Sequence, residues 1–303
     1  QSRRYLQQAA KSAAFILSEL DPEALLSEAN APADANIQLN DNKLAAEQPL
    51  TNLPCPVIYV PNIRDFFGDL VQLRLQYAQP VVLPTVAAVT GTNGKTTPAR
   101  MTPHIFKSAG RRVGLTTTDA VYIDGHKTVE GDMTGPAAAR MVLRDPTVDT
   151  AVLETARGGL LRRGMGYRHC NVGAVLNVAS DHLGLRGINT LEELAEVKRI
   201  IVETAWDAAV LNADDEHCLQ MADSTEADHI CYVTLNAHHP LVREHILAGG
   251  RAVVLEEGIA GHMLTLYDSG AHMPLCWSHL VPATLDGKAL HNVQNAMFAA
   301  AIT

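Results

Sequence analysis

A glycine-bearing turn carries the residues of this chain that are best suited to chemistry. Residues 90–97 read Thr-Gly-Thr-Asn-Gly-Lys-Thr-Thr and directly follow an apolar run. The glycines let backbone N–H groups approach an anion, Lys95 can neutralise nucleotide phosphates, and Thr96 offers a hydroxyl to Mg²⁺. Val89 stands where the strict phosphate-loop pattern requires glycine, so the motif is a shortened form, and an ordinary strand-to-helix turn is the alternative. The candidate nucleotide-binding residues here are Gly91, Thr92, Asn93, Gly94, Lys95, Thr96 and Thr97.

Two later segments place polar side chains after apolar runs. Glu154 ends the run 150–154, and residues 175–180 lead into Asp181 and His182. A carboxylate at the end of an interior parallel strand lies where open α/β sheets bind ligands, and it could complete an Mg²⁺ shell. The alternatives are a helix-start charge for Glu154 and a structural role for His182. The candidate metal-binding residues are Thr96, Glu154 and His182.

Three further polar residues lie in helical patterns. Lys198 is spaced among apolar residues so that it can approach the same sheet edge, although a solvated lysine is the alternative. Asn292 and Asn295 fall one turn apart on one helix face. An amide offers both the donor and the acceptor that an adenine edge requires, while Asn292 could instead cap the helix.

Alternating strands and helices must position these residues. The pattern predicts a mostly parallel sheet flanked by helices, followed after Arg251 by an antiparallel extension. The predicted strands are 86–90, 113–117, 150–154, 173–178, 208–212 and 229–234, and the helices between them are 97–108, 191–205 and 215–221.

The first part of the chain has a different pattern. It predicts a helix over 5–20, a strand over 56–60 and a helix over 62–77. We therefore expect a small N-terminal α/β domain over 1–84 and a central nucleotide-binding domain over 85–303.

Composition narrows the class of protein. The 303 residues are 47% apolar and only 5% aromatic, which is typical of an aliphatic α/β core. A net charge of -9 argues against non-specific nucleic-acid binding, and no apolar run reaches the ~18 residues of a membrane span. The five cysteines form no CxxC pair, so we expect reduced thiols in a cytoplasmic protein.

Several motifs in order resemble the Mur ligase superfamily, and within it most resemble the ligase half of cyanophycin synthetases. Residues 57–64 and 67–68 instead resemble the N-terminal domain of muramoyl-tripeptide synthetases. The central motifs are residues 91–97, 116–119, 131–136, 153–159, 176–184, 212–215 and 291–295.

The resemblance implies an ATP- and Mg²⁺-dependent amide ligase that forms an acyl phosphate, of the acid–amino-acid ligase class. It implies that Lys95 stabilises the transferring phosphate and that Lys198 aligns with a lysine that some Mur ligases carry as a carbamate. It further implies that Thr96 and Glu154 hold one Mg²⁺, that His182 holds a second ion, and that Asn292 and Asn295 read adenine.

Three hypotheses about the function remain, two with different acceptor substrates and one without activity. The closer resemblance implies addition of an amino acid such as arginine to an aspartate carboxylate of a peptide polymer. The N-terminal segment favours a UDP-N-acetylmuramoyl-peptide ligase, and an inactive nucleotide-binding scaffold is the third reading. A small-molecule or peptide-polymer acceptor and an amino acid are the expected partners, with no nucleic acid or membrane, and a homo-oligomer is compatible. We also expect the superfamily's C-terminal domain to be absent from this chain.

Overall fold

The computed structural model describes residues 16–18, 23–24, 56–61, 84–180, 183–184 and 187–303. The chain divides into two compact units, Gln1–Val81 and Val82–Thr303. In the first unit, β1 (Ile16–Ser18) pairs in parallel with β2 (Val57–Tyr59).

Strand β1 corrects one prediction. It lies inside the helix predicted over 5–20, so that helix is wrong at Ile16–Ser18. Pairing with β2 supplies the backbone partners here, and such tertiary context overrides local helix propensity. The strand predicted over 56–60 is confirmed as β2, whereas the helix predicted over 62–77 lies outside the described residues.

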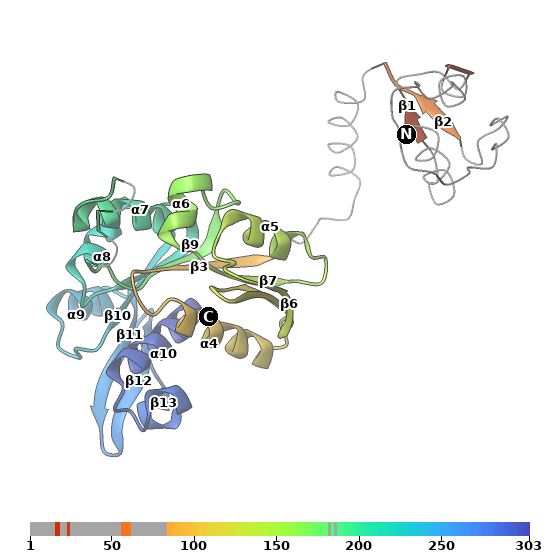
Figure 1. Ribbon diagram of the computed structural model, residues 1–303. Helices are drawn as coiled ribbons and strands as arrows, with labels where there is room; N and C mark the ends of the chain where they lie inside the picture. The colour runs from red at the N-terminus through yellow and green to blue at the C-terminus, as the bar shows by residue number, and fades with distance from the viewer. Residues whose placement is uncertain (1–15, 19–22, 25–55, 62–83, 181–182, 185–186) are drawn as a thin grey trace. The chain divides into compact units, whose positions relative to one another are not determined.

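The second unit is built on one large sheet (Figure 1). Its eleven described strands lie in the order β13-β12-β11-β10-β9-β8-β3-β7-β4-β5-β6. The strands from β11 to β4 in this order are parallel, and an antiparallel pair extends each edge. The predicted mostly parallel sheet and its antiparallel extension after Arg251 are therefore confirmed.

The bounds of the elements are as follows. The strands are β3 (Thr85–Thr90), β4 (Val113–Thr116), β5 (Ala120–Ile123), β6 (His126–Glu130), β7 (Thr150–Glu154), β8 (Cys170–Val175), β9 (Ala205–Asn212), β10 (His229–Thr234), β11 (Arg251–Gly258), β12 (Gly261–Asp268) and β13 (Ala271–Trp277). The helices are α4 (Thr96–Ser108), α5 (Pro136–Arg144), α6 (Arg157–Arg163), α7 (Leu191–Glu203), α8 (Glu216–Gln220), α9 (Pro240–Leu247) and α10 (Leu290–Ile302), with short 3-10 turns at Met221–Ser224, Ser278–Leu280 and Pro282–Thr284.

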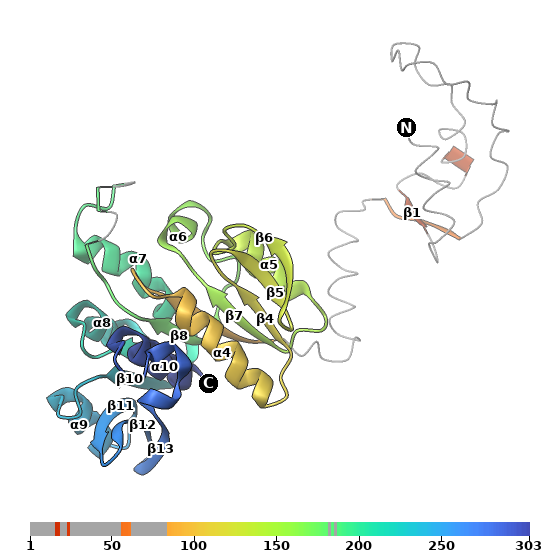
Figure 2. The same cartoon turned by 60° about the horizontal axis from the view of Figure 1, so that its bottom comes forward.

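Helices cover both faces of the sheet. Helices α4 and α10 lie side by side on one face, where Ala99 and Phe298 join the core of alternate strand residues such as Val89 (Figure 2). Helices α5 to α9 pack on the other face. Because both faces are covered, the central strands are mostly buried, β7 over its whole length, and they read as largely apolar runs.

The β5–β6 hairpin was not among the predicted elements. Its turn is Asp124-Gly125, with φ of 48° and 85°. Two successive positive φ angles match the tight hairpin turn that an Asp-Gly pair favours. The pair between two runs rich in β-branched residues was the available signal.

Two expectations from composition can be compared with the fold. Within the described residues, no helix is long and apolar enough to cross a membrane. The described cysteines carry free thiols, and burial raises the pKa of Cys170 and Cys231 to about 12. Cys55 lies outside the described residues.

Candidate functional site

Neighbouring parallel strands bring the predicted site residues to one edge of the sheet. Strand β3 lies between β7 and β8, with Val89 paired to Glu154 and Thr90 paired to Val175. Parallel strands end at the same edge, which is where open α/β sheets bind ligands. The predicted phosphate loop after β3 therefore lies next to Glu154 at the end of β7.

Asn177, just after β8, shapes the predicted phosphate loop. Its Oδ1 accepts hydrogen bonds from the N–H groups of Thr92 (3.0 Å) and Asn93 (2.9 Å), and its Nδ2 donates to the Asn93 carbonyl (3.1 Å). These two N–H groups are already bonded within the protein, so an anion would meet the first turn of α4 instead. The sequence-based predictions placed Asn177 inside the strand over 173–178 and did not select it, although a polar residue at the end of an apolar run was the signal that selected Glu154.

Gly94 brings the phosphate loop against α10. Its φ of 76° lies in the left-handed region, and a Cβ there would lie 3.1 Å from Asn295 Oδ1. Any larger residue would therefore strain the turn and press on the asparagine. The close approach explains why glycine occupies this position, and it places the buried Asn295 directly beside the loop.

The two predicted asparagines bond to each other and to a nearby turn. Asn295 Nδ2 donates to Asn292 Oδ1 (3.2 Å), and Asn292 Nδ2 donates to the Ala283 carbonyl (2.7 Å). Helix α10 begins at Leu290 with Ala289 as its N-cap residue, so the alternative of N-capping by Asn292 is wrong. Asn292 lies instead in the first turn of the helix.

Thr96 and Glu154 form the polar centre of the site. Thr96 Oγ1 donates to Glu154 Oε1 at 3.1 Å, and only 2% of Glu154 is exposed. Burial raises the pKa of Glu154, while the Thr96 hydrogen bond and the charge of Lys95 oppose this shift. Glu154 Oε2 is buried and accepts no hydrogen bond from any described residue.

This oxygen set fits a magnesium ion. A buried carboxylate oxygen without a partner is costly, and Mg²⁺ binds carboxylate and hydroxyl oxygens. The described residues contain no group of three His, Cys, Asp or Glu that could hold a metal by itself. Thr96 and Glu154 would therefore need oxygens from a ligand, such as nucleotide phosphates, to complete the coordination of the ion. The predicted ligand His182, with Asp181, lies outside the described residues.

Lys198 is buried in α7, and the alternative of a solvated lysine is wrong. Only 2% of it is exposed, and burial lowers its pKa to about 7, with further lowering by the charges of Lys95 and Arg157. Its electrostatic coupling to Lys95 places it near the phosphate loop, as the spacing predicted. Gly173 in β8 allows α7 to come this close, because a Cβ there would lie 2.4 Å from the Ile201 carbonyl oxygen.

A second group of side chains holds the segment after β8, which in turn contacts the phosphate loop. Asn212 Nδ2 donates to the Leu176 carbonyl (2.7 Å), and its Oδ1 accepts from Gln294 Nε2 (3.2 Å). Asp215 caps α8 by accepting from the Cys218 N–H (3.0 Å), and it also accepts from the Val178 N–H (2.8 Å). These bonds fix the segment after β8 and so fix Asn177.

Comparison with known proteins identifies the family. Residues 89–303 match the family described as Mur ligase middle domain, and the chain belongs to that family. It is 45% identical over 238 residues to the cyanophycin synthetase of Nostoc sp., an alignment that covers 78% of this chain and 26% of that protein. The chain thus spans about a quarter of the length of the cyanophycin synthetases that it matches.

More distant relatives share the fold. The UDP-N-acetylmuramoyl-L-alanyl-D-glutamate–2,6-diaminopimelate ligase of Listeria innocua is 29% identical over 213 residues, covering 66% of this chain and 42% of that protein. A solved structure of a ligase with the same name superposes with a TM-score of 0.50 at 22% identity, covering 96% of this chain and 61% of that chain. At this identity the superposition speaks for the fold alone.

Proposed function

We propose that this chain is the nucleotide-binding part of an ATP-dependent amide ligase. The observation that carries the proposal is the hydrogen bond between the half-buried Thr96 and the buried Glu154 beside a phosphate-loop turn, with one carboxylate oxygen lacking a hydrogen-bond partner among the described residues. A ligand that supplies a divalent cation and further oxygens would satisfy this carboxylate. ATP with Mg²⁺ has that chemistry, and the family membership supports it.

The proposed reaction joins a carboxylate to an amine in two steps. The substrate carboxylate attacks the γ-phosphorus of ATP, which gives an acyl phosphate and ADP, and the amine of an amino acid then displaces phosphate to form the amide. Lys95 and the first turn of α4 would bind and orient the phosphates as charge moves among their oxygens. Thr96 and Glu154 would hold Mg²⁺, which supplies charge neutralisation when bound.

Other residues have narrower proposed roles. Lys198 would lie near the carboxylate of the bound substrate. Its amine is close to half protonated near neutral pH, given its pKa of about 7. Asn292 and Asn295 would contact the adenine, with Asn295 already placed beside Gly94. His182 would hold a second ion near the acyl phosphate.

We infer the acceptor from the strength of the similarities. The 45% identity to a cyanophycin synthetase favours addition of an amino acid such as arginine to an aspartate carboxylate of a peptide polymer. The 29% identity to a ligase named for a UDP-N-acetylmuramoyl substrate makes that acceptor the competing candidate.

Intact Lys95, Thr96 and Glu154 argue against an inactive scaffold. Free thiols support a cytoplasmic location, and the oligomeric state stays a prediction.

The test combines acceptor choice with one pair of variants. ATP turnover by the full-length protein is measured with an aspartate-arginine polymer plus arginine, and separately with the UDP-linked muramoyl peptide plus a diamino acid. We expect turnover with the polymer only, and a loss of about a hundredfold or more in Lys95→Ala.

Lys107→Ala is the matched control for this variant. Lys107 lies on the same helix, but its Nζ bonds to Asp124 (3.2 Å) away from the loop, so turnover should be unchanged. Turnover with the muramoyl peptide alone would reverse the choice of acceptor. Unchanged turnover in Lys95→Ala would overturn the site itself.

A further inference from the structure

Asn93, in the turn between β3 and α4, is the one asparagine of the chain that is followed by glycine. Its side chain is exposed. The amide of an asparagine reacts most readily with the backbone when glycine follows, because glycine has no Cβ to hinder the approach of its nitrogen. The turn that is proposed to bind phosphates therefore carries a reactive pair of its own.

Hydrogen bonding separates Asn93 from the other asparagines in the described part of the chain. The seven others each have a hydrogen-bonded side chain and are followed by a residue larger than glycine; they are Asn171, Asn177, Asn189, Asn212, Asn236, Asn292 and Asn295. The side-chain amide of Asn93 bonds to no described residue, since its two partners are bonded to its backbone. An amide without a partner can turn toward the backbone, whereas a bonded amide is held away from it.

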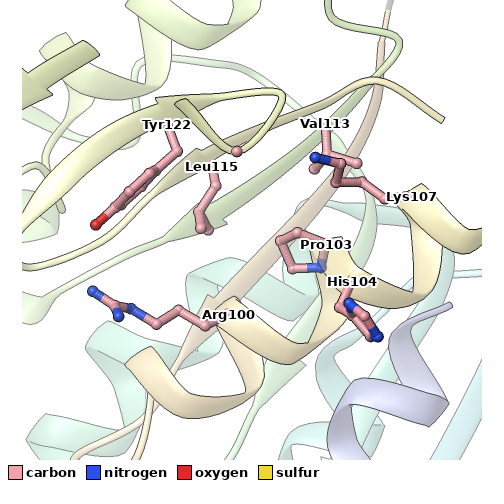
Figure 3. A pocket seen from close by; sticks show the side chains of 8 residues that line it. Arg100, Pro103, His104, Lys107, Val113, Leu115 and Tyr122 are labelled. Atoms are coloured by element: carbon pink, nitrogen blue, oxygen red, sulfur yellow. The ribbon is translucent and has the colours of Figure 1, made fainter. Parts of the chain in front are cut away.

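Exposed polar side chains on the next helix are held by partners. Figure 3 shows Arg100 and Lys107, both from α4, at a pocket of about 260 Å³. Arg100 pairs with Asp119 (2.6 Å) and Lys107 pairs with Asp124 (3.2 Å). Exposure alone therefore does not leave a polar side chain without a partner here, and Asn93 differs from these residues.

The nitrogen that can attack this amide belongs to Gly94. Gly94 is exposed, and its N–H donates to no described residue. The Asn93 carbonyl belongs to the same planar peptide group, and it accepts a hydrogen bond from Asn177 Nδ2 (3.1 Å). The Asn93 N–H donates to Asn177 Oδ1 (2.9 Å). Asn177 thus holds the backbone on both sides of Asn93 and restrains the rotation that brings the Gly94 nitrogen to the side chain.

We propose that Asn93 is a self-modification site, at which the empty phosphate loop converts this amide to a carboxylate. The Gly94 nitrogen loses its proton to hydroxide and bonds to Asn93 Cγ, the Cγ–Nδ2 bond breaks, and ammonia leaves with a proton from water. Water then opens the cyclic imide at either carbonyl, which gives aspartate or isoaspartate. The net reaction consumes one water and releases one ammonia, and nothing is oxidised or reduced.

The product changes the phosphate loop in two ways. A carboxylate at position 93 adds negative charge where the proposed function places phosphates, and isoaspartate also adds one carbon to the backbone of the turn. A bound nucleotide would cover the turn, so an occupied loop is protected and an empty loop is inactivated. This protection rests on the proposed function, whereas the modification itself does not.

The test incubates the chain without nucleotide at pH 8.5 and locates the products by peptide mass spectrometry. We expect Asn93 to show the change in mass from an amide to a carboxylate, with release of ammonia. Asn189 is the matched control, because it is also exposed but donates from Nδ2 to the Gly187 carbonyl (3.3 Å). No product at Asn93, or as much product at Asn189, would overturn the assignment.

Two variants measure the restraint by Asn177. Asn177→Ala should speed the reaction at Asn93 about tenfold, because the bonds that hold the backbone are lost. Asn177→Asp keeps acceptors for the N–H groups and loses only the donor to the Asn93 carbonyl, so its rate should be intermediate. Thermal unfolding checks that each variant is folded, and Asn177→Asp carries the test if Asn177→Ala is not. Equal rates in the folded proteins would overturn the role of Asn177.

A non-hydrolysable ATP analogue separates this inference from the proposed function. With Mg²⁺, at a hundred times its dissociation constant, it should slow the reaction about a hundredfold in proportion to the empty chain that remains. Product at Asn93 without protection would leave the modification standing and remove the nucleotide from this loop. Binding of the analogue by calorimetry, with no product at Asn93 in its absence, would leave the proposed function standing and overturn the modification.

The effect of the product on binding has its own measurement. Asn93→Asp, which carries the charge of the product, should bind the analogue with Mg²⁺ about tenfold more weakly than the neutral Asn93→Ser. Equal affinities would overturn the inactivation of the loop by the added charge.

Discussion

Lys198 and Arg199 are neighbours on α7, but their side chains lie in opposite environments. Arg199 faces solvent and bonds to Glu203 (2.7 Å) and Glu196 (3.3 Å), in pairs that are at least one-third exposed. Lys198 is buried, and it forms no ion pair or hydrogen bond with any described residue. On the outer surface of α7, Arg199 is therefore paired with glutamates, whereas Lys198 on the inner surface has no such partner within the described part of the chain.

The same contrast holds for the carboxylates. Glu154 at the site is buried, and one of its oxygens has no hydrogen-bond partner among the described residues, while the glutamates on the outer surface of α7 are solvated. Unpaired buried charge costs stability, so a fold retains it where a ligand compensates it. We therefore propose that the sheet edge binds charged ligands and that its buried groups lower the stability of the free protein, which is the usual trade-off between stability and function.

The largest expected effect is on Lys198. Lys198→Met should raise the free energy of unfolding by about 1–4 kcal/mol at pH 6.5, because it removes a buried charge with no partner among the described residues. The folded pKa of about 7 lies below the ordinary 10.5, so below pH 7 both folded and unfolded states are protonated and the full penalty applies. As pH rises from 7 toward 10.5 only the unfolded state keeps the proton, and the penalty fades.

Urea unfolding of both proteins at pH 6.5 and pH 9.5 measures this effect. The stability difference should be clearly smaller at pH 9.5. A variant that is less stable than the unchanged chain at pH 6.5 would show that Lys198 is compensated within the folded protein, and the comparison with Arg199 would fail.

A smaller effect is expected at Glu154. Glu154→Gln should raise the free energy of unfolding by about 1–2 kcal/mol without nucleotide, because a desolvated carboxylate is replaced by a neutral amide. The folded pKa is raised above 4.5, so the penalty is absent below pH 4.5, grows as the pH rises from 4.5 to the folded pKa, and is complete above the folded pKa. Unfolding at pH 7 and at pH 4 would show the difference disappear in acid.

Ligand binding sharpens the test of Glu154. Saturating ATP with Mg²⁺ should stabilise the unchanged chain by about 2.7 kcal/mol at a hundred times the dissociation constant. The same ligand should not stabilise Glu154→Gln, which lacks the carboxylate for Mg²⁺. Equal stabilisation of both proteins by ATP and Mg²⁺ would remove Glu154 from the site.

The smallest effect is expected on the outer surface of α7. Arg199→Ala should change the free energy of unfolding by less than about 0.5–1 kcal/mol, since exposed ion pairs contribute little and salt screens them. The measurement is urea unfolding at low and high salt. A loss of several kcal/mol would show that the outer charges are as costly to change as the buried ones.

Much of the site was predictable because its signals are local. Buried parallel strands read as apolar runs, so the strands over 150–154 and 229–234 were predicted with the bounds that the structure has. A glycine-lysine-threonine turn after such a strand can be recognised in the sequence without knowing which distant residues it contacts. The predicted strand at 173–178 begins and ends three residues later than β8, because sheet pairing decides where an apolar run stops being a strand.

The unpredicted residues depend on pairing between distant segments. Asn177 clamps the phosphate loop only because β8 lies next to β3, and Thr118 reaches Thr96 only because β4 lies next to β7. Asn295 was predicted as a site residue, but its place beside the loop depends on Gly94, which lacks a side chain at a left-handed turn. Strand order is a property of the whole sheet, so spacing along the chain gives no measure of these distances.

The sequence by itself determined the class of fold, the phosphate-loop turn and the carboxylate that faces it, because periodicity and residue type act over a few residues. Only the tertiary structure decided that Lys198 is buried, that Asn177 uses two of the loop's N–H groups, and that Thr118 lies within hydrogen-bonding distance of Thr96. The physical reason is that burial and hydrogen bonding are set by the neighbours a residue meets in space, and the order of strands in the sheet chooses those neighbours.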